Sequence, residues 1–237
     1  QIIPKIMLTL TTTIVQFELP KHLACPKPTE DRGIPRDAVR LLVTGNNGMD
    51  IQHHHFHQFA DFFEEGDVLV VNTSATQAAA LPIPLPSGGA GMLHFSTKLA
   101  HQQWLIEIRE QRNAKTFRWK NGVEGMKIPF PEGGYIQLQQ RFYKNEQLLD
   151  LWIAEIHLPS AFSDYMQEHG QAIKYTNVDQ PHPLSYYQTA FSFHPGSSEM
   201  PSAGRGFTPS LIEKLLAKGV QFAPVLLHTG VSSLEED

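Results

Sequence analysis

A switch between strand-like and helix-like hydrophobic patterns at residues 38–72 constrains the fold most strongly. The apolar run at 38–45 ends in turn residues and predicts a strand. Phenylalanines then recur at helical spacing within 56–66, which predicts a helix closed by a glycine. The continuous apolar run at 67–72 is typical of a strand buried on both faces. Strand, helix and strand in this order predict an α/β core.

The middle of the chain has a different character. A Pro/Gly-rich stretch at 81–91 is expected to be a linker, and five short β-rich runs separated by turn residues follow it. Short strands at this spacing predict a small antiparallel sheet or barrel. We therefore expect an α/β main domain, split into residues 1–77 and 158–237, that is interrupted by an inserted antiparallel β-barrel domain at 78–157.

Composition excludes some classes of protein. The net charge of −5 argues against a surface built mainly to hold a nucleic acid backbone. Cys25 is the only cysteine, so an intrachain disulfide and a thiolate-rich metal site are excluded and a reducing cytoplasm is expected. Residues 1–17 are interrupted by Pro4 and Lys5 and are too short and too polar to span a bilayer. Met7 is a candidate for the natural start.

The clearest single element is a helix expected at 208–219. Thr208 can cap it, Pro209 suits its first position and Gly219 ends it. Helical signals are expected to return only after the inserted domain. The helix therefore belongs to the second half of the main domain.

The loop MPSAGRGF at 200–207 leads directly into that helix. Gly204 and Gly206 allow the backbone to approach a ligand closely, and Arg205 adds a positive charge. The helix N-terminus that follows suits a carboxylate or a phosphate. A tight loop with a good N-cap is the alternative explanation of the same residues.

Polar residues also follow the apolar runs that predict strands. The run at 220–228 is expected to be a buried strand that delivers His228 at its carboxyl end, and NTSATQ at 72–77 ends another. Ligands bind at this edge of open α/β sheets. YYQTAF at 186–191 offers side chains that bind a base or, alternatively, pack and cap. A lone histidine such as His228 is also compatible with a purely structural role.

Together these stretches resemble a known family. The succession FELP, RDAVRLLV, EEGDVLVVN, YYQTAF, PSAGRGF, LIEKLLAKGV and VLLHTG is similar in order and spacing to the S-adenosylmethionine:tRNA ribosyltransferase-isomerases of queuosine biosynthesis. The resemblance runs in register from about residue 17 to 234 and is weakest in the β-rich insert. It implies an α/β domain interrupted by a small β-barrel, as the residues themselves predict.

The resemblance also implies a reaction. S-adenosylmethionine acts as ribosyl donor to 7-aminomethyl-7-deazaguanine in tRNA, giving epoxyqueuosine and releasing adenine and methionine. S-adenosylmethionine is then a co-substrate, and no resident cofactor or metal is expected. We take His228 as the candidate for proton handling, the loop at 201–207 for the methionine carboxylate, and Tyr187 and Gln188 for adenine. The full set of expected substrate-binding residues is Asn72, Tyr187, Gln188, Thr189, Ser202, Ala203, Gly204, Arg205, Phe207 and Gly230.

The sequence departs from the family pattern in three places. Arg205-Gly206 stands where the family has Leu-His, and NTSATQAAAL stands where it has NTRVIPARL, so two arginines are absent. The family also continues beyond Asp237, so we expect the main domain to be incomplete at that end. These departures leave two alternatives: a diverged enzyme with another acceptor, or a non-catalytic module that binds a nucleoside or RNA. The oligomeric state stays open.

The histidine-rich stretch IQHHHFHQF at 51–59 invites comparison with a metal site. His53 and His57 have i, i+4 spacing, but a helix that starts near His55 does not hold both on one face. A histidine and a phenylalanine also precede this helix in the family. We therefore expect the cluster to be structural.

Overall fold

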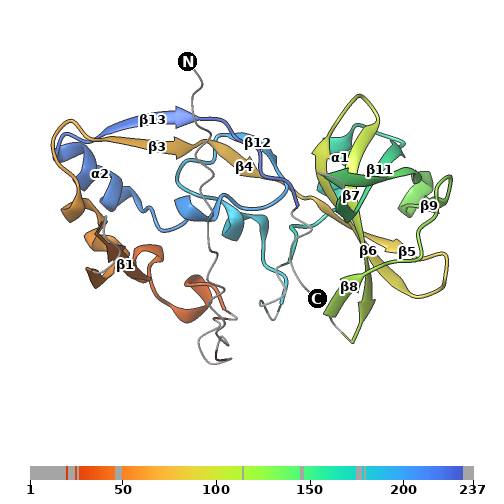
Figure 1. Ribbon diagram of the computed structural model, residues 1–237, viewed down its shortest axis with the longest axis horizontal. Helices are drawn as coiled ribbons and strands as arrows, with labels where there is room; N and C mark the ends of the chain where they lie inside the picture. Colours follow the sequence, from red (N-terminus) through yellow and green to blue (C-terminus); the bar gives the residue numbers. More distant parts are fainter. Residues whose placement is uncertain are drawn as a thin grey trace, which may run out of the picture.

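The computed structural model describes residues 20, 25, 27–45, 50–113, 115–144, 147–174, 178 and 180–231, with the side chains of 143–149 left out. The N-terminal stretch 1–17, including Met7, and the residues after 231 lie outside this description. Two lobes flank a central junction (Figure 1). We call them the α/β lobe and the β lobe.

The α/β lobe contains two small sheets and two helices. Strand β1 (Arg40–Thr44) pairs antiparallel with β2 (Ile51–His55), and the 3-10 helix η4 (Phe56–Phe62) follows. Strand β3 (Val68–Asn72) pairs parallel with β13 (Gln221–Val225), which comes after helix α2 (Pro209–Ala217). The predicted strand, helix and strand at 38–72 are thus confirmed in order, with an additional strand, β2, in front of a 3-10 helix.

Apolar side chains from these elements and from the segments next to them form one core. Its buried members are Ala60, Val71, Phe191, Phe207, Leu211, Leu215 and Val220. Leu211 and Leu215 lie one turn apart on the same face of α2, which explains why this segment is helical. Complete burial of a leucine side chain contributes roughly 1.5–3 kcal/mol.

The prediction that residues 67–72 form a strand buried on both faces was wrong. Val68 and Val70 are 56% and 66% exposed, whereas Val71, the next residue, is 8% exposed. Successive side chains of a strand point to opposite faces, and the core covers only one of them. The strand expected to be buried at 220–228 is likewise only partly covered, since Pro224 and Leu226 are exposed.

Short elements form the junction between the lobes. Strand β4 (Ser74–Thr76) pairs parallel with β12 (His194–Ser197). Around this pair lie the 3-10 helices η2 (Glu30–Arg32), η3 (Arg36–Ala38), η6 (Leu184–Tyr187) and η7 (Ser202–Gly204). Figure 1 shows β4 and β12 in the middle of the molecule.

The β lobe is a seven-stranded antiparallel sheet. Its strands are β5 (Ala80–Pro84), β6 (Ala90–Lys98), β7 (Gln103–Arg112), β8 (Lys115–Arg118), β9 (Lys127–Pro129), β10 (Tyr135–Lys144) and β11 (Gln147–His157), with η5 (Pro131–Gly133) between β9 and β10. The spatial order is β5-β6-β7-β11-β10-β9, and β8 pairs with β7. The predicted antiparallel sheet is confirmed.

The expected linker at 81–91 was wrong in part, because its first residues form strand β5. Leu81 and Ile83 are buried, whereas Pro82 and Pro84, which alternate with them, are exposed. Proline cannot donate a hydrogen bond within a sheet, so it is confined to positions such as this terminal strand. The proline content concealed the alternating pattern.

The core of the β lobe extends beyond the sheet. Helix α1 (Phe162–His169) contributes Tyr165 and Met166 to it. The Phe162 ring also stacks on Trp104 of β7, with 4.4 Å between ring centroids. The inserted sheet therefore packs against a helix that follows the expected insert boundary at 157.

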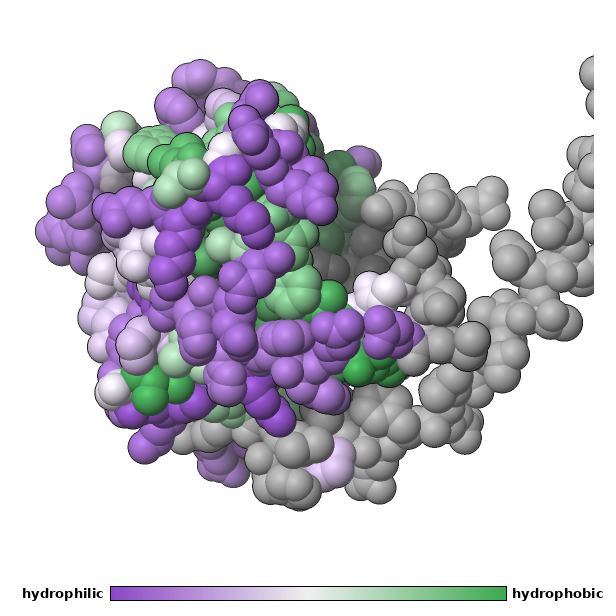
Figure 2. Space-filling view, turned by 90° about the vertical axis from the view of Figure 1, so that its left-hand side faces the viewer, coloured by the Kyte–Doolittle hydropathy of each residue, from purple (hydrophilic) through white to green (hydrophobic). Residues whose placement is uncertain are grey.

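Figure 2 looks onto the end of the α/β lobe that lies farthest from the β lobe. This face is mostly hydrophilic, with small hydrophobic patches between charged and polar side chains. Within the described residues, no helix is both long enough and apolar enough to cross a membrane.

Candidate functional site

Strand β4 connects most of the residues expected to form a site. Its first residue, Ser74, contacts His228 and β12, and its last residue, Thr76, contacts the 187–188 segment. The stretches at 72–77, 186–191 and 225–230 thus meet at the junction. The positions of 72–77 and His228 after apolar runs predict this for those two stretches only. β4 is too short to have been recognised as a strand from the sequence.

His228 lies at this junction with its imidazole exposed. Its Nδ1 lies 2.7 Å from the Ser74 Oγ, which lies 2.6 Å from the Ser197 Oγ. The Thr229 backbone N–H donates to that same Ser197 Oγ at 3.0 Å. Gly196 gives the ring its space, because a Cβ built there comes within 2.3 Å of the His228 Cε1. Ser74 and Gly196 therefore fix the position of the imidazole, and Ser197 and the Thr229 N–H hold Ser74 in turn.

Asn72 holds the two strand ends together. Its Nδ2 donates to the Leu227 carbonyl at 2.7 Å, and its Oδ1 accepts from the Leu227 N–H at 3.0 Å. The same Oδ1 also accepts from the Ser74 N–H at 3.1 Å. The Asn72 side chain thus forms hydrogen bonds with the backbone at the start of β4 and just after the end of β13.

Tyr187 and Gln188 attach helix η6 to β4. The Gln188 amide accepts from the Thr76 N–H at 3.1 Å and donates to the Thr76 carbonyl at 2.8 Å. The Thr76 hydroxyl donates to the Tyr187 carbonyl at 2.9 Å. Burial raises the pKa of the Tyr187 phenol, against a hydrogen bond with the His182 backbone that lowers it. The phenol therefore stays neutral at physiological pH.

The loop at 201–207 packs against the protein through its glycines. A Cβ at Gly204 would lie 3.2 Å from Thr189, and one at Gly206 would lie 2.7 Å from the Phe56 ring. The N–H groups of Gly204 and Phe207 donate to carbonyls of this same loop. Ser202 and Ala203 are exposed. The glycines thus serve close protein packing, which agrees with the alternative of a tight loop.

Arg205 does not present a free positive charge. Its Nη2 pairs with the Glu30 Oε2 at 2.5 Å and its Nη1 donates to the Thr29 Oγ1 at 3.1 Å. Arg36 binds the other Glu30 oxygen at 2.7 Å and donates to the Gln188 carbonyl at 2.5 Å. Glu30 therefore joins two arginines from distant parts of the sequence.

The pKa of the Glu30 carboxyl reflects this arrangement. Burial alone raises the pKa, but hydrogen bonds from Arg205, the backbone, Thr29 and Arg36 together lower it from 4.5 to about 2. The carboxylate is consequently charged at any physiological pH, and it compensates Arg205. The additional positive charge expected from Arg205 is therefore already neutralised by Glu30.

The N-terminus of α2 also has a protein carboxylate beside it. The Thr208 hydroxyl accepts from the Leu211 N–H at 3.3 Å, which confirms the predicted cap, and donates to the Asp37 Oδ2 at 2.8 Å. Asp37 thus lies where the sequence predicts a ligand carboxylate or phosphate.

Phe207 and Gly230 contact protein rather than an open site. Phe207, expected to bind substrate, is instead a core residue that is 8% exposed and lies edge-on to Phe56 and Phe59. A Cβ at Gly230 would lie 2.7 Å from the Ser96 Oγ of β6. Thr189, also expected in the site, is buried and its hydroxyl accepts from the Phe191 N–H at 3.2 Å.

The sequence matches the model of a known protein family. The family model described as "Queuosine biosynthesis protein" matches residues 12–237. The chain belongs to the queuosine biosynthesis protein family. Two relatives illustrate the similarity. S-adenosylmethionine:tRNA ribosyltransferase-isomerase from Thermotoga petrophila is 30% identical over 217 residues, and the protein of the same name from Staphylococcus haemolyticus is 29% identical over 224.

The extent of these matches is unequal. They cover 92% of this chain but only 59% and 60% of the two relatives, so the chain spans about three fifths of their length. A solved S-adenosylmethionine tRNA ribosyltransferase from Thermotoga maritima is 26% identical, with 90% of this chain and 57% of that chain covered and a TM-score of 0.33.

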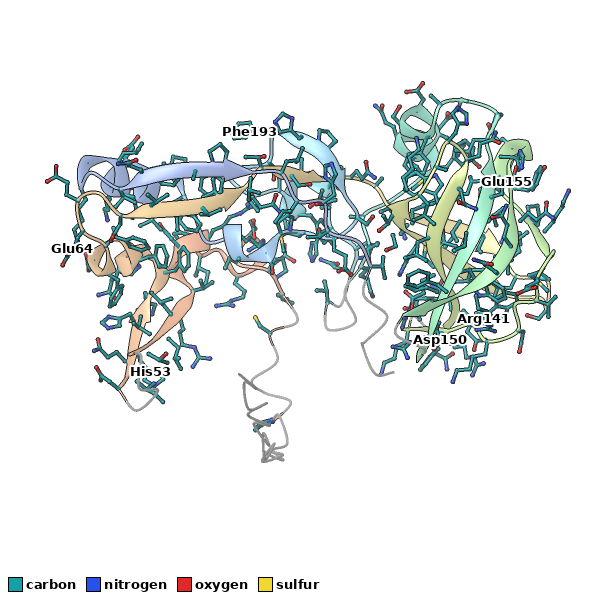
Figure 3. All side chains as sticks on the ribbon, turned by 45° about the horizontal axis from the view of Figure 1, so that its top comes forward. His53, Glu64, Arg141, Asp150, Glu155 and Phe193 are labelled. Carbon is teal, nitrogen blue, oxygen red and sulfur yellow. The ribbon has the colours of Figure 1, made fainter. Side chains whose placement is uncertain are left out.

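In this member of the queuosine biosynthesis protein family, the histidine-rich stretch lies away from the junction. Figure 3 shows His53 beside the tip of the β1–β2 hairpin. His53 belongs to β2 and His57 to η4, which confirms that no single helix face holds both. The rings of His55 and His57 stack at 5.6 Å.

In the described part of the chain, only one group of residues has ligand atoms close enough together to hold a metal ion, and it does not include the histidine-rich stretch. Glu132, Glu168 and His169 have such atoms within 4.8 Å of one another. Both carboxylates are 71% exposed and the group lies in the β lobe, so it has no part in the junction. That the protein needs no metal stays a prediction.

The sequence did not single out Ser74, Ser197, Glu30 and Arg36, although all four organise the junction. Ser74 lies within the NTSATQ stretch that was predicted to end a strand, and Ser197 is the last residue of strand β12. Ser74 lies more than 100 residues from both of its side-chain partners, Ser197 and His228. No local pattern identifies such contacts.

Proposed function

We propose that this chain acts as an S-adenosylmethionine:tRNA ribosyltransferase-isomerase. It transfers the ribosyl moiety of S-adenosylmethionine to 7-aminomethyl-7-deazaguanine in tRNA and rearranges it to epoxyqueuosine, releasing adenine and methionine. Its family and the names of its relatives support this reaction. The observation that carries the proposal is the convergence of Asn72, Gln188 and His228 on strand β4.

The reaction needs controlled proton and charge transfer. The sulfonium of S-adenosylmethionine acidifies the neighbouring C5′–H, and removal of that proton starts attack and ring opening. Adenine then departs with an electron pair. His228 suits the departure of adenine, because a neutral imidazole held at fixed orientation carries one donor nitrogen that can face the departing group.

Substrate contacts can be assigned to the surfaces that remain open. Ser202 and Ala203 are the exposed part of the 201–207 loop, and we assign the methionine carboxylate to them. Gln188 uses one amide proton and its oxygen on Thr76, and its second amide proton has no partner among the described residues, so we assign it to adenine. Arg205 and Tyr187 then stabilise the protein around the site rather than contact the substrate.

A diverged acceptor is the second candidate, and two observations favour it. The net charge is −5, and phosphate contacts dominate RNA affinity. Arginines of the β lobe are also engaged: Arg141 lies 3.8 Å from Asp150 and 4.6 Å over the Trp152 ring (Figure 3). On this alternative the chain binds S-adenosylmethionine but acts on a small molecule or another nucleoside. A non-catalytic nucleoside- or RNA-binding module is the third reading of the same junction.

The remaining functional assignments follow from the proposed reaction. S-adenosylmethionine serves as co-substrate without a resident cofactor, tRNA is the macromolecular partner, and the place of action is the cytoplasm. No membrane partner is proposed.

The experiment that tests the proposal is adenine release measured by mass spectrometry. The full chain is incubated with S-adenosylmethionine, with and without tRNA that carries 7-aminomethyl-7-deazaguanine. Adenine that appears only with this tRNA supports the reaction. Calorimetric binding of S-adenosylmethionine without adenine release supports a changed acceptor, and absence of binding contradicts both enzymatic readings.

We also propose that the antiparallel sheet of the β lobe forms a small, partly open barrel. Two features support this: the terminal strands of the sheet, β5 and β9, contact each other, and one buried core fills the sheet from the inside. Such closure protects strand edges from pairing with other chains.

A further inference from the structure

Three side chains at the junction form an unbroken line of hydrogen bonds. The Ser197 Oγ lies 2.6 Å from the Ser74 Oγ, which lies 2.7 Å from the Nδ1 of His228. Both serines are 0% exposed, whereas the imidazole reaches solvent. Water therefore does not compete for the two hydroxyl groups, and each hydroxyl proton has to find a partner inside the protein.

The direction of this line follows from its buried end. The Thr229 backbone N–H can only donate, and it donates to the Ser197 Oγ at 3.0 Å. Among the described residues, the other polar atom within reach of the Ser197 hydroxyl is the Ser74 Oγ. Ser197 therefore donates its proton to Ser74, and the Ser74 proton is left to point at His228.

We infer that Ser74 and Ser197 are positioning residues that fix His228 as the tautomer with its proton on Nε2. The Nδ1 of His228 accepts the hydrogen bond from Ser74, so in the neutral ring the proton resides on the other nitrogen. The reverse direction would leave Ser197 with two donors aimed at its oxygen and no acceptor for its own proton. A buried donor without a partner is costly.

The inference assigns a specific role to the exposed face of His228. Nε2–H is a hydrogen-bond donor, so this atom contacts an acceptor of the substrate and does not remove a proton from it. On the proposed function, on which this step rests, that acceptor is a ring nitrogen of the adenine group, whose negative charge grows as it departs. The base that takes the C5′ proton is then another group.

Gly196 supports the same assignment. Its missing side chain lets the imidazole lie directly over the backbone of β12, where an added Cβ would be 2.5 Å from Nδ1 and 2.6 Å from Nε2. This contact keeps the ring from turning away from Ser74. The ring's orientation and its tautomer are thus set by separate neighbours.

The experiment is nitrogen NMR of the full chain with ¹⁵N-labelled histidine, in the absence of substrate. Spectra at pH 8.5, where histidine side chains are ordinarily neutral, distinguish a protonated from an unprotonated ring nitrogen. A His228→Gln variant assigns the signal. We expect an unprotonated Nδ1 and a protonated Nε2 for His228 and averaged signals for the exposed His194 of strand β12. A proton found on Nδ1 of His228 overturns the inference, whatever the catalytic activity.

Two further measurements separate positioning from mere structure. In Ser74→Ala, we expect the His228 signals to become averaged like those of His194 and kcat for adenine release to fall at least tenfold with a smaller change in KM. Unchanged His228 signals in this variant contradict the role of Ser74. Addition of adenosine is expected to shift the Nε2 signal, whereas addition of methionine is not; the opposite pattern assigns the donor to a carboxylate and overturns the adenine contact.

Discussion

At the scale of single residues, the charged side chains at the junction form ion pairs with one another. Glu30 lies between Arg205 and Arg36, and its carboxylate accepts from both. The sequence predicts Arg205 as a ligand contact because a charged residue between two glycines before a helix is typical of anion sites. Its partner lies 175 residues earlier, so only the folded structure reveals the ion pair.

Replacing Glu30 with Gln is expected to lower the free energy of unfolding by about 2–3 kcal/mol at pH 7, because the shift of its pKa from 4.5 to about 2 is lost. A lowered pKa stabilises the folded state above pH 4.5, and this contribution disappears as the pH falls toward 2. Urea unfolding at pH 7 and at pH 3 measures it. The exposed Glu124→Gln serves as control, and an equal difference at both pH values contradicts the account.

Gly196→Ala is expected to displace the His228 imidazole, because the added Cβ would lie 2.3 Å from its Cε1. Misplacement of a reacting group costs roughly 10²-fold in rate, so we expect about that loss of adenine release. Gly125→Ala is a matched control, since Gly125 also has positive φ (+80°) but no atom lies within 4 Å of an added Cβ. Equal activity of both variants would exclude the contact.

At the scale of elements, local patterns succeeded where the element forms from its own residues. Helix α2 begins at Pro209 after the Thr208 cap, as predicted, and its two core leucines lie one turn apart. The stretch at 56–62 instead forms a 3-10 helix that follows strand β2. Helical spacing of phenylalanines does not distinguish these two helix types over so few residues. Strand β5 escaped prediction because its prolines resemble a linker.

Thr208→Ala is expected to destabilise the protein by about 1–2 kcal/mol, because its hydroxyl both caps α2 and bonds Asp37. Urea unfolding measures the change. Ser210→Ala, an exposed position in the first turn of the same helix, is expected to alter stability by less than about 0.5 kcal/mol. Equal effects at the two positions would show that the cap contributes nothing.

At the scale of the whole molecule, the site depends on contacts between the lobes. The segment after β13 leaves the α/β lobe and binds β6, where the Ser96 Oγ accepts from the Val231 N–H at 3.0 Å. Ser198 of the junction also donates to the Ser96 carbonyl at 2.9 Å. The sequence predicts both lobes from their different hydrophobic periods, but it contains no pattern for contacts such as these, which join residues 102 and 135 positions apart.

Ser96→Ala is therefore expected to reduce adenine release while the fold persists, because it releases the segment that carries His228. We expect a loss of about twofold to tenfold, the rate equivalent of one hydrogen bond of roughly 0.5–1.5 kcal/mol. Steady-state kinetics measure it. Ser163→Ala, at an exposed position in α1, is the control. A Ser96→Ala enzyme with full activity would show that the lobes act independently.

Under the proposed function, His228 beside strand β4 takes part in the reaction. The most direct measurement is adenine release from S-adenosylmethionine by the wild-type chain, His228→Gln and His194→Gln, with tRNA carrying 7-aminomethyl-7-deazaguanine. His194 lies exposed on the neighbouring strand β12 and provides the matched control. We expect His194→Gln to keep wild-type turnover and His228→Gln to lose at least about 10²-fold. Full turnover by His228→Gln would contradict the claim.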